Sequence, residues 1–483
     1  MTTKAVVFVE KGRAEVQSVP VPKLRDEYMR VSVKAVGLNP TDWKHIDMPM
    51  ADAGARIGCD YCGVVEEVGS KVTKKFGKGD RVAGFAHGGD LTQHENGAFA
   101  QQIVVKGDAQ MKLPDNVSDT DAATLGVSVV TVGQGLYRTL GLPLPTEPAH
   151  NEDYVLIHGG STATGIYGIQ FARLSGYKVV ATASPHNFGY LKELGAEQVF
   201  DYKSLTVGED IRKYTDNKLK LGWDCTGSGS KIIASALSRD GGKYAAIIPP
   251  NEDEIKSVNP NVDGPHTTLG YAVLGESFSK FGKDFPAQPE EYEFVKKFTS
   301  IAQQLLVDGK LKAPRVILNR GGTGLESALK GLDELRGNKL GRFGDILATT
   351  PYMDARYSYV DTLLHCFGNS GDPFDVLQTA LDHIFDMLLK DRSDSSAVGN
   401  IIPNINYDHG DISIPYIDIE KAGMFESLDV AWLDEHSMEL RPVVVVALTK
   451  VRILLYLQAM RNSDMPPAAF FLPRFETSSV TSL

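Results

Sequence analysis

Short runs of alternating apolar and polar residues dominate the first 125 residues of the chain. Gly, Pro and Asp separate these runs, and no long helical repeat comes between them. A repeat of two residues is typical of half-buried β-strands that are joined by turns. The pattern predicts an irregular β domain, with strands in KAVVFVE, YMRVSVKAVGL, CGVVEEVG, DRVAGFA and FAQQIVV.

From about residue 126 the pattern changes to apolar strands that alternate with amphipathic helices. The predicted strands are YVLIHG, KVVATAS, QVFDY, LGWDCTG, KYAAIIP and LGYAVLG, and the helices include TGIYGIQFARLSG and NFGYLKELGA. Strands joined by helices at short spacing form right-handed βαβ crossovers. We therefore predict an α/β fold in which residues 126–284 form a doubly wound parallel sheet.

The C-terminal third has a different texture. Residues 290–340 again show helical periodicity, in EYEFVKKFTSIAQQLLVDGK and ESALKGLDELRGNK. After about residue 345 the periodicity is weak and turn-forming residues are frequent. Residues 345–483 are therefore expected to be either a small appended module or a poorly ordered segment.

Composition and charge narrow the class of protein. The 483 residues are 42% hydrophobic and 23% charged, with a formal net charge of −11 and no basic block. This balance argues against nucleic acid or an anionic membrane as the main partner. The N-terminus alternates like a strand and lacks the apolar core of a signal peptide. Lys450 and Arg452 interrupt the most apolar late run, so no membrane span is expected. Four cysteines make no disulfide framework, which favours a reducing, cytoplasmic location.

The segment VLIHGGSTATG supplies a strand, a glycine-rich turn and a helix start. Gly159, Gly160 and Gly165 permit a tight turn, and helix N-termini stabilise pyrophosphate through free amide groups. Ser161, Thr162 and Thr164 could add hydroxyl donors. The alternative is a tight strand–helix turn without a ligand, but the repeated βαβ context favours a nucleotide.

The end of the next strand distinguishes two cofactors. NAD-binding proteins usually carry Asp or Glu there, which binds the ribose 2′-hydroxyl group. Here Ser184, His186 and Asn187 replace the carboxylate, so nothing at this place repels a 2′-phosphate. The sequence therefore favours NADPH over NADH. A Ser-Pro turn with a helix cap at Asn187 is compatible with the same role.

Cysteine and histidine residues give weak signals for a metal. Cys59 and Cys62 form one CxxC pair, with no second pair and no partner histidine at a suitable spacing. We rank buried thiols first, a redox pair second and a metal site third. His87 and His94 are expected to be loop or pocket-rim residues, and Cys225 and Cys366 are isolated. We predict no bound metal.

These segments together resemble the medium-chain dehydrogenase/reductase superfamily. Within it, the chain is most similar to the zinc-independent trans-acting enoyl reductases of fungal polyketide clusters and to ToxD-like oxidoreductases. The resemblance covers roughly residues 1–340, in AVGLNPTDWKH, GCDYCGVVEEVGSKV, KGDRVAGFAHGG, ENGAFAQ, LGLPLPTEPA, HGGSTATG, RLSGYKVVATASPHNF and LGAEQVFDYK. The superfamily's zinc-ligand positions are matched by Asn39, Cys59 and Val127, of which only Cys59 could bind metal.

The resemblance implies a fold and a division of the chain. A GroES-like catalytic domain (residues 1–125, completed by 285–344) would enclose a Rossmann NADPH-binding domain (126–284), with the active site between them. Residues 345–483 would be a C-terminal extension of unknown role. Relatives close with a strand of the kind GKVSGKKLVYR, whereas LRGNKLGRFGDILATT departs from this pattern after about Leu340.

The resemblance also implies site residues. Thr41 and Lys44 would be catalytic, and Thr41, Asp42, Trp43 and Lys44 would face the nicotinamide, with Thr131 near its ring. The other expected residues contact pyrophosphate (Ser161, Thr162, Ala163, Thr164), the adenosine end with its 2′-phosphate (Ser184, Pro185, His186, Asn187, Tyr202), the cofactor trough (Ile247, Ile248) and the substrate channel (Gly270, Tyr271, Ala272, Val273, Leu274).

Three functions remain open from the sequence. The first is an NADPH-dependent enoyl reductase that reduces an α,β-unsaturated acyl thioester on a polyketide synthase acyl carrier. The second is a quinone or small-enone reductase, because both reactions need only an apolar space beside the nicotinamide. The third is an NADPH-binding protein with weak catalysis. A monomer or a homodimer is expected in each case.

Overall fold

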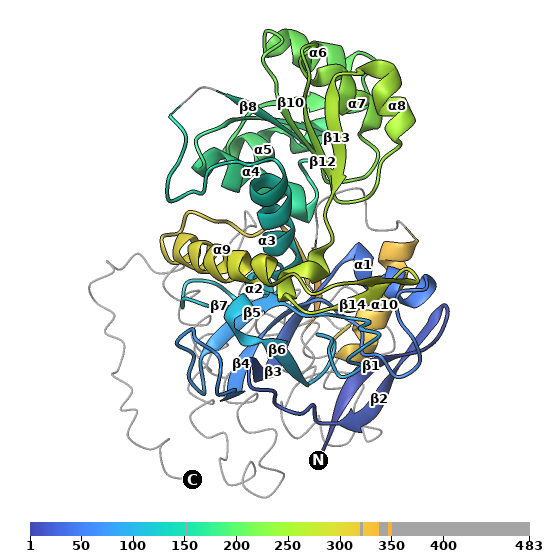
Figure 1. Cartoon of the computed structure of the whole chain (residues 1–483). Coiled ribbons are helices and arrows are strands. Elements are labelled where there is room, and N and C mark those ends of the chain that lie inside the picture. Colours follow the sequence, from blue (N-terminus) through green and yellow to red (C-terminus); the bar gives the residue numbers. More distant parts are fainter. Residues whose placement is uncertain (151–152, 319–321, 338–345, 350–483) are drawn as a thin grey trace, which may run out of the picture. The chain divides into compact units, whose positions relative to one another are not determined.

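The computed structural model describes residues 1–150, 153–318, 322–337 and 346–349, which are drawn in colour in Figure 1. Most of the predicted C-terminal extension, residues 345–483, lies outside the described residues, and so does Cys366. No described helix combines the length and the apolar character that are needed to cross a membrane.

The N-terminal part folds as the predicted β domain. A two-stranded ribbon is formed by β1 (Thr2–Glu10) and β2 (Arg13–Pro20). Five strands of a seven-stranded sheet follow: β3 (Tyr28–Leu38), β4 (Asp60–Val68), β5 (Arg81–Phe85), β6 (Gln102–Lys106) and β7 (Met111–Lys112). Strand β2 was not predicted from the sequence. All its residues are exposed or half-buried, so its apolar alternation is weak. Helix α1 (Pro40–Asp47) follows β3, and η1 (Gly107–Ala109) and α2 (Asp119–Ala122) are short.

Segments after residue 285 complete the seven-stranded sheet. They are α9 (Pro289–Val307), β16 (Val316–Leu318), α10 (Leu325–Arg336) and β17 (Ile346–Thr349). Strand β17 pairs antiparallel with β3 and parallel with β16. It belongs to the stretch after Leu340 where the sequence departs from its relatives, and it still supplies a closing strand. We propose that the GroES-like domain continues through β17.

The central part forms the predicted parallel sheet. Its strands are β8 (Tyr154–His158), β9 (Lys178–Ala183), β10 (Ala196–Asp201), β11 (Leu221–Asp224), β12 (Gly242–Ala246) and β13 (Val262–Thr267). They lie in the order β10-β9-β8-β11-β12-β13, and every pair is parallel. The order reverses between β8 and β11, and ligands of such sheets bind at the carboxyl ends of the strands beside this switch point.

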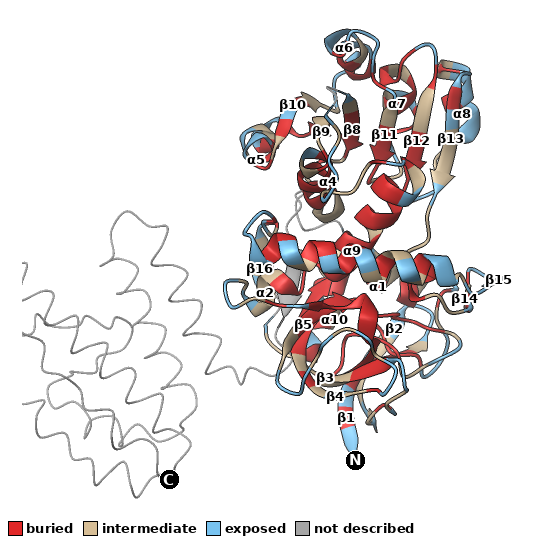
Figure 2. Ribbon diagram, turned by 60° about the vertical axis from the view of Figure 1, so that its left-hand side comes forward, coloured by how far each residue is buried: buried red, intermediate tan, exposed pale blue. Residues whose placement is uncertain are grey.

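Helices cover both faces of this sheet. Val155 and Ile157 of β8 pack in one cluster with α4 (Ala163–Leu174) and α5 (Phe188–Glu193). Leu156 points the other way, into a cluster with α6 (Val207–Tyr214), α7 (Ser230–Ala236) and α8 (Glu252–Val258). Strands that are buried on both sides are continuously apolar, which is the pattern of the predicted strands. Figure 2 shows the buried strands between exposed helix faces. Helices α3 (Gly126–Val132) and η2 (Gly133–Thr139) precede the sheet, and η3 (Pro185–Asn187) follows β9.

The prediction of a strand in LGYAVLG is wrong. Gly270–Leu274 form a short 3₁₀ helix, η4, and the sixth strand is β13, whose sequence VDGPHT was not recognised. A short buried apolar run has no periodicity that separates strand from helix. Strand β13 contains Gly264 and Pro265 and lies at the sheet edge, where proline is tolerated. The hairpin β14 (Phe278–Lys280) and β15 (Lys283–Phe285) follows η4.

Candidate cofactor site and active site

The glycine turn after β8 is tight at all three predicted glycines. Gly159 has φ +78, a conformation that favours glycine. A Cβ on Gly165 would lie 2.3 Å from the Gly159 carbonyl oxygen, and a Cβ on Gly160 would lie 3.0 Å from the Ala181 Cβ. The backbone of the turn therefore approaches α4 and β9 more closely than any side chain permits.

Thr162 caps α4 at the turn. Its hydroxyl group accepts a hydrogen bond from the Gly165 amide (3.0 Å) and donates one to the Gly159 carbonyl (2.8 Å). The Thr162 hydroxyl is therefore engaged within the turn, contrary to the expectation that it could donate to a phosphate. Ser161, Ala163 and Thr164 are half-buried beside it, and no described residue forms a hydrogen bond with the hydroxyl of Ser161 or Thr164. These two hydroxyls and the first amides of α4 are the donors at this helix start.

Buried hydrogen bonds join the ends of β8 and β9. The Gly160 amide donates to the Thr182 carbonyl (2.9 Å), and the Thr182 hydroxyl lies 2.8 Å from Nδ1 of His158. Burial lowers the pKa of His158, so its ring is neutral near pH 7. The turn is thus fixed to the neighbouring strand before any ligand binds.

The predicted adenosine-end residues lie at the carboxyl ends of β9 and β10. Ser184 and Asn187 are buried, whereas Pro185 and His186 are exposed on η3. Asn187 occupies the cap position of α5 without a capping hydrogen bond. Its buried Nδ2 has no hydrogen-bond partner among the described residues. Tyr202 is half-buried and directly follows β10.

The loop after β11 was missed by the sequence analysis. The Asp224 carboxylate ends the strand, is fully buried and accepts hydrogen bonds from the amides of Thr226, Gly227 and Gly229. It also accepts from the hydroxyl of Thr226 and from Tyr244. The loop lies on the other side of the switch point from the glycine turn. An Asp at the end of a strand, two residues before Thr-Gly, is the signal that could have indicated it.

Three further predicted residues lie on neighbouring elements. Ile247 is half-buried and Ile248 is exposed, directly after β12. A Cβ on Gly227 would lie 2.8 Å from the Cβ of Ile248, so the β11 loop and the end of β12 are in contact. Thr131 lies on α3, and its hydroxyl donates to the Val127 carbonyl (2.6 Å).

Helix α1 carries the predicted catalytic residues. Asn39 precedes the helix, and its amide donates to the Asp42 carboxylate (2.7 Å). Thr41, Trp43 and Lys44 are half-buried, while Asp42 is fully buried. Burial lowers the pKa of Lys44. Each of these residues is therefore held on one rigid element.

Hydrogen bonds connect the segments at the superfamily's zinc-ligand positions. The Asn39 side-chain amide donates to one oxygen of Asp60 (2.9 Å), and the Val127 amide donates to the other (2.5 Å). Asp60 is fully buried, and burial raises its pKa to about 8. Asn39 and Val127 thus belong to a direct network in which neither offers a metal ligand.

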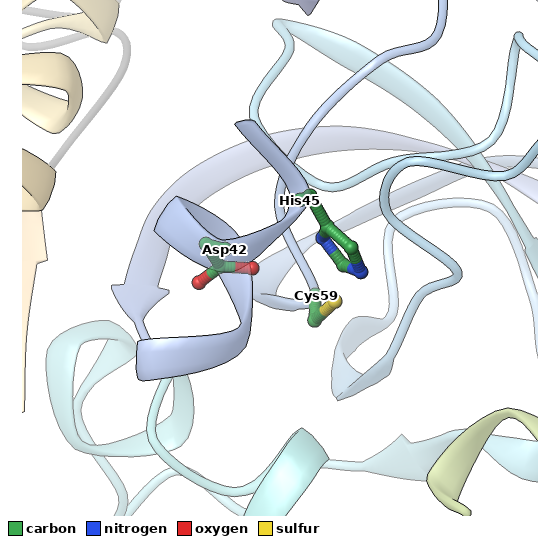
Figure 3. Close-up of side chains that lie close together, drawn as sticks. All are labelled: Asp42, His45 and Cys59. Atoms are coloured by element: carbon green, nitrogen blue, oxygen red, sulfur yellow. The ribbon is translucent and has the colours of Figure 1, made fainter. Parts of the chain in front are cut away.

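Cys59 nevertheless lies close to two potential ligands, which corrects the expectation that no suitable histidine was available. Asp42 and His45 occupy one face of α1 and point toward Cys59 (Figure 3). One ligand atom from each of the three lies within 4.8 Å of the others. Burial, and then the nearby Lys280 ammonium, lower the pKa of His45. The same buried ammonium partly offsets the rise in the pKa of Cys59 that burial causes. A dication would be repelled by this ammonium, so the cluster fits a metal poorly.

The two cysteines of the CxxC pair belong to different hydrophobic clusters. Cys59 packs near Phe85 and Tyr271, and Cys62 packs near Ala35 and Ala83. Both are buried free thiols, as is Cys225. Burial raises the pKa of each well above its ordinary value, so these thiols are protonated near neutral pH.

His87 and His94 lie in the loop after β5, as the sequence predicted, but His87 is buried there. It is only 5% exposed, and its ring stacks on Tyr271 with centroids 4.6 Å apart. His94 is about half exposed and lies 2.7 Å from Asp52. The segment Gly270–Leu274 contributes its buried Tyr271 to the same cluster. The Tyr271 phenol lies 3.0 Å from the Thr41 hydroxyl and 2.7 Å from Nε2 of His45.

Comparisons with known proteins identify the family. Residues 25–115 match the alcohol dehydrogenase GroES-like domain, and residues 163–281 match the zinc-binding dehydrogenase family. Trans-enoyl reductase ACTTS2 of Alternaria alternata is 45% identical over 343 residues, which cover 70% of this chain and 97% of that protein. The chain belongs to the trans-enoyl reductases. This family lies within the medium-chain dehydrogenase/reductase superfamily, as the sequence motifs predicted.

Other members of the family and of the superfamily are also similar. Trans-enoyl reductase TOXD of Cochliobolus carbonum is 48% identical over 279 residues, covering 57% of this chain and 92% of that protein. Among solved structures, an alcohol dehydrogenase superfamily protein from Novosphingobium aromaticivorans has a TM-score of 0.58 at 23% identity, covering 72% of this chain and 99% of that one. CurK enoyl reductase has a TM-score of 0.55 at 19% identity, covering 72% and 99%. These structures confirm the predicted fold of a GroES-like domain with a Rossmann sheet.

Proposed function

We propose that this trans-enoyl reductase uses NADPH, without zinc, to reduce an α,β-unsaturated acyl thioester that a polyketide synthase carries. One observation carries the proposal: the chain matches ACTTS2, itself named a trans-enoyl reductase, over 97% of that protein's length. Both the glycine turn and helix α1 lie within the part of the chain that resembles these relatives. An oxidoreductase with a nicotinamide cofactor is therefore the function that the site supports best.

The carboxyl edge of the parallel sheet fits NADPH. The glycine turn, Ser161 and Thr164 would hold the pyrophosphate at the start of α4. Nδ2 of Asn187 is buried without a hydrogen-bond partner among the described residues, and Ser184 directly precedes η3. A buried donor that lacks an acceptor is costly, and a ribose 2′-phosphate would supply that acceptor. No carboxylate follows β9 before α5, which favours NADPH over NADH.

Zinc independence is supported by the network at Asp60. Asn39 and Val127, at two of the superfamily's ligand positions, donate hydrogen bonds to this carboxylate. Cys59 occupies the third ligand position, and the buried Lys280 ammonium near it disfavours a dication there. We therefore assign no step to a metal. A cytoplasmic location agrees with three buried free thiols.

When bound, NADPH supplies a hydride to the β-carbon of the acyl chain. Negative charge then develops on the thioester oxygen, so the residues beside the reacting carbon must stabilise an oxyanion. Lys44 and Thr41 are the donors that we assign to this role, because both are half-buried on α1. A partly dehydrated ammonium interacts more strongly with an anion than one in water.

The test is oxidation of NADPH by the purified chain with three substrates: an enoyl-pantetheine thioester, a quinone and a simple aldehyde. Selective turnover of the thioester is expected, and a carrier-bound thioester should react faster than the pantetheine. The saturated thioester serves as the matched control. Turnover of the quinone alone would instead favour a quinone reductase. NADPH binding without turnover of any substrate would leave a weakly catalytic binding protein.

A further inference from the structure

Tyr271 connects two residues of helix α1 through its phenol oxygen. This oxygen lies 3.0 Å from Oγ1 of Thr41 and 2.7 Å from Nε2 of His45. Tyr271 comes from η4, which is 226 residues away from His45 in the chain. The three side chains therefore form one continuous chain of hydrogen bonds from Thr41 to His45.

Burial restricts the protonation states of the residues in this chain of hydrogen bonds. His45 is fully buried and Tyr271 is 6% exposed. Burial, and then the Lys280 ammonium, lower the pKa of His45 well below its ordinary value, so the ring is neutral and carries one N–H group. If Nε2 holds the proton, it donates to Tyr271, Tyr271 donates to Thr41, and the Thr41 hydroxyl points its proton outward. If Nδ1 holds the proton, every donor in the chain reverses.

At the inner end of this chain of hydrogen bonds, two buried polar atoms have no hydrogen-bond partner in the described part of the protein. Nδ1 of His45 and Oδ1 of Asp42 are both buried without a hydrogen-bond partner among the described residues. One ring nitrogen of His45, one carboxyl oxygen of Asp42 and the Cys59 sulfur lie within 4.8 Å of one another, so the His45 ring and the Asp42 carboxyl group are neighbours (Figure 3). One water molecule can bridge a separation of this size. Burial raises the pKa of Asp42 to about 7, so its carboxyl group can hold a proton near neutral pH.

We propose that Tyr271 and His45 form a proton relay behind Thr41. The relay orients the Thr41 hydroxyl. When Thr41 gives its proton to the reduced acyl chain, the relay replaces that proton with one from Asp42. The inference rests on the proposed function, and it adds two positioning residues, Tyr271 and His45, to the reaction. The short distances on both sides of the phenol oxygen are the observation that carries it.

The proton transfers balance. Hydride addition at the β-carbon leaves an electron pair shared by the α-carbon and the thioester oxygen. The Thr41 hydroxyl gives its proton to the α-carbon and takes the phenol proton of Tyr271. Tyr271 takes the Nε2 proton of His45. Nδ1 of His45 then takes a proton from a water molecule that bridges it to Asp42, and this water takes the carboxyl proton of Asp42. Asp42 ends as a carboxylate, and uptake of one proton through the reversed chain restores it after product release.

Three variants of the protein distinguish a proton relay from a purely structural role of these side chains. Tyr271→Phe removes only the shared hydroxyl group. His45→Gln keeps a donor or acceptor near Tyr271 but cannot exchange a proton between two ring nitrogens. Tyr167→Phe is the matched control, because the buried Tyr167 phenol also pairs with a threonine hydroxyl, that of Thr124 (2.9 Å), with no histidine behind it.

The experiment measures NADPH affinity, turnover of the enoyl-pantetheine thioester and the solvent deuterium isotope effect on turnover. We expect Tyr271→Phe and His45→Gln to lower turnover by about 100-fold, the scale of general acid catalysis. NADPH affinity should be unchanged, and the isotope effect should increase because protonation becomes rate-limiting. Tyr167→Phe should match the wild type in all three measurements.

Each other outcome overturns the relay in a distinct way. Unchanged turnover in Tyr271→Phe removes the relay and leaves the proposed function intact. Lost NADPH affinity, or lower turnover with an unchanged isotope effect, assigns Tyr271 a structural role only. If Tyr271→Phe does not fold, His45→Gln decides by the same criteria. If the wild type binds NADPH but reduces no enoyl thioester, the proposed function is wrong and the relay is wrong as well.

Discussion

The Asp224 carboxylate accepts a hydrogen bond from the Gly229 amide at 2.8 Å, which closes the loop after β11. Thr226, Gly227 and Tyr244 donate to the same buried carboxylate. Hydrogen bonds to an ionised acceptor are stronger than those between neutral groups. One side chain thus sets the shape of a loop beside the switch point of the sheet.

Asp224→Asn should destabilise the protein and weaken NADPH binding. The amide group that replaces one oxygen cannot accept from the donors that now face it, so we expect a loss of about 2–3 kcal/mol in the free energy of unfolding. Denaturant unfolding with and without NADPH measures both effects. Asp216→Asn is the control, since the side chain of Asp216 is 85% exposed. Equal stability of the two variants would contradict the role of Asp224.

Gly165→Ala should disrupt the nucleotide turn. The new Cβ would lie 2.3 Å from the Gly159 carbonyl oxygen, so the turn or the start of α4 must shift. Overpacking of this kind costs about 1–3 kcal/mol, and NADPH affinity should fall at least tenfold. Titration of NADPH fluorescence measures the affinity.

The matched control for this glycine is Gly189→Ala on α5, where an added Cβ meets no atom within 4 Å. Alanine favours the helix, so Gly189→Ala should stabilise the protein by about 0.5–1 kcal/mol and leave NADPH affinity unchanged. Equal affinities of the two alanine variants would show that the turn does not bind the cofactor.

The nucleotide turn could be predicted because its determinants are adjacent in the sequence. Strand, glycines and helix follow one another within VLIHGGSTATG, and the change from alternating to helical periodicity marks the boundary. The role of Thr162 could not be predicted, because a threonine before a helix can cap it or bind a ligand. Only the positions of Gly159 and Gly165 show that its hydroxyl group is engaged in the turn.

Contacts between distant segments could not be predicted from the sequence. Tyr271 was expected in a strand, and its contact with His45 depends on how η4 packs against α1. The sequence around His45 did not indicate a functional role, because its neighbour Cys59 lies on another segment. Asp224 was also missed, since its donors are mostly backbone amides, which every sequence contains.

Ser184→Asp should reverse the preference for NADPH. A carboxylate at the end of β9 repels a 2′-phosphate and accepts from a free ribose hydroxyl. Like charges in contact cost several kcal/mol, so NADPH affinity should fall by about 30-fold or more, while NADH affinity rises. Binding of both cofactors is measured by titration. Ser257→Asp on α8 adds the same charge at an exposed site and should change neither affinity.

Lys44→Ala should lower turnover while NADPH binding largely survives. Lys44 is half-buried on α1, and burial lowers the pKa of its ammonium. Loss of one donor to a developing oxyanion costs about 100-fold in turnover. Steady-state reduction of an enoyl-pantetheine thioester measures this loss. Lys213→Ala, at an exposed position of α6, should have wild-type turnover. Unchanged turnover in Lys44→Ala would remove Lys44 from the mechanism.

Lys280 links the hairpin after η4 to two loops of the β domain. Its buried ammonium donates hydrogen bonds to the carbonyls of Met50 (2.8 Å), Gly88 (3.2 Å) and Gly89. Lys280→Met would leave these carbonyls without a donor, at an expected cost of about 2 kcal/mol in the free energy of unfolding. Lys283→Met, on the exposed second strand of the same hairpin, should have no such effect.

The stability difference between wild type and Lys280→Met should depend on pH. Burial lowers the pKa of Lys280 to about 8 from 10.5. Between these values the unfolded chain binds more protons than the folded chain at this residue, so its contribution to stability rises with pH. The difference between the two proteins should widen by about 1.4 kcal/mol per pH unit from about pH 8 to about pH 10.5. Denaturant unfolding at pH 7.5, 8.5 and 9.5 measures it, with Lys283→Met as reference. A constant difference would mean that the Lys280 ammonium keeps its proton in the folded protein throughout this range.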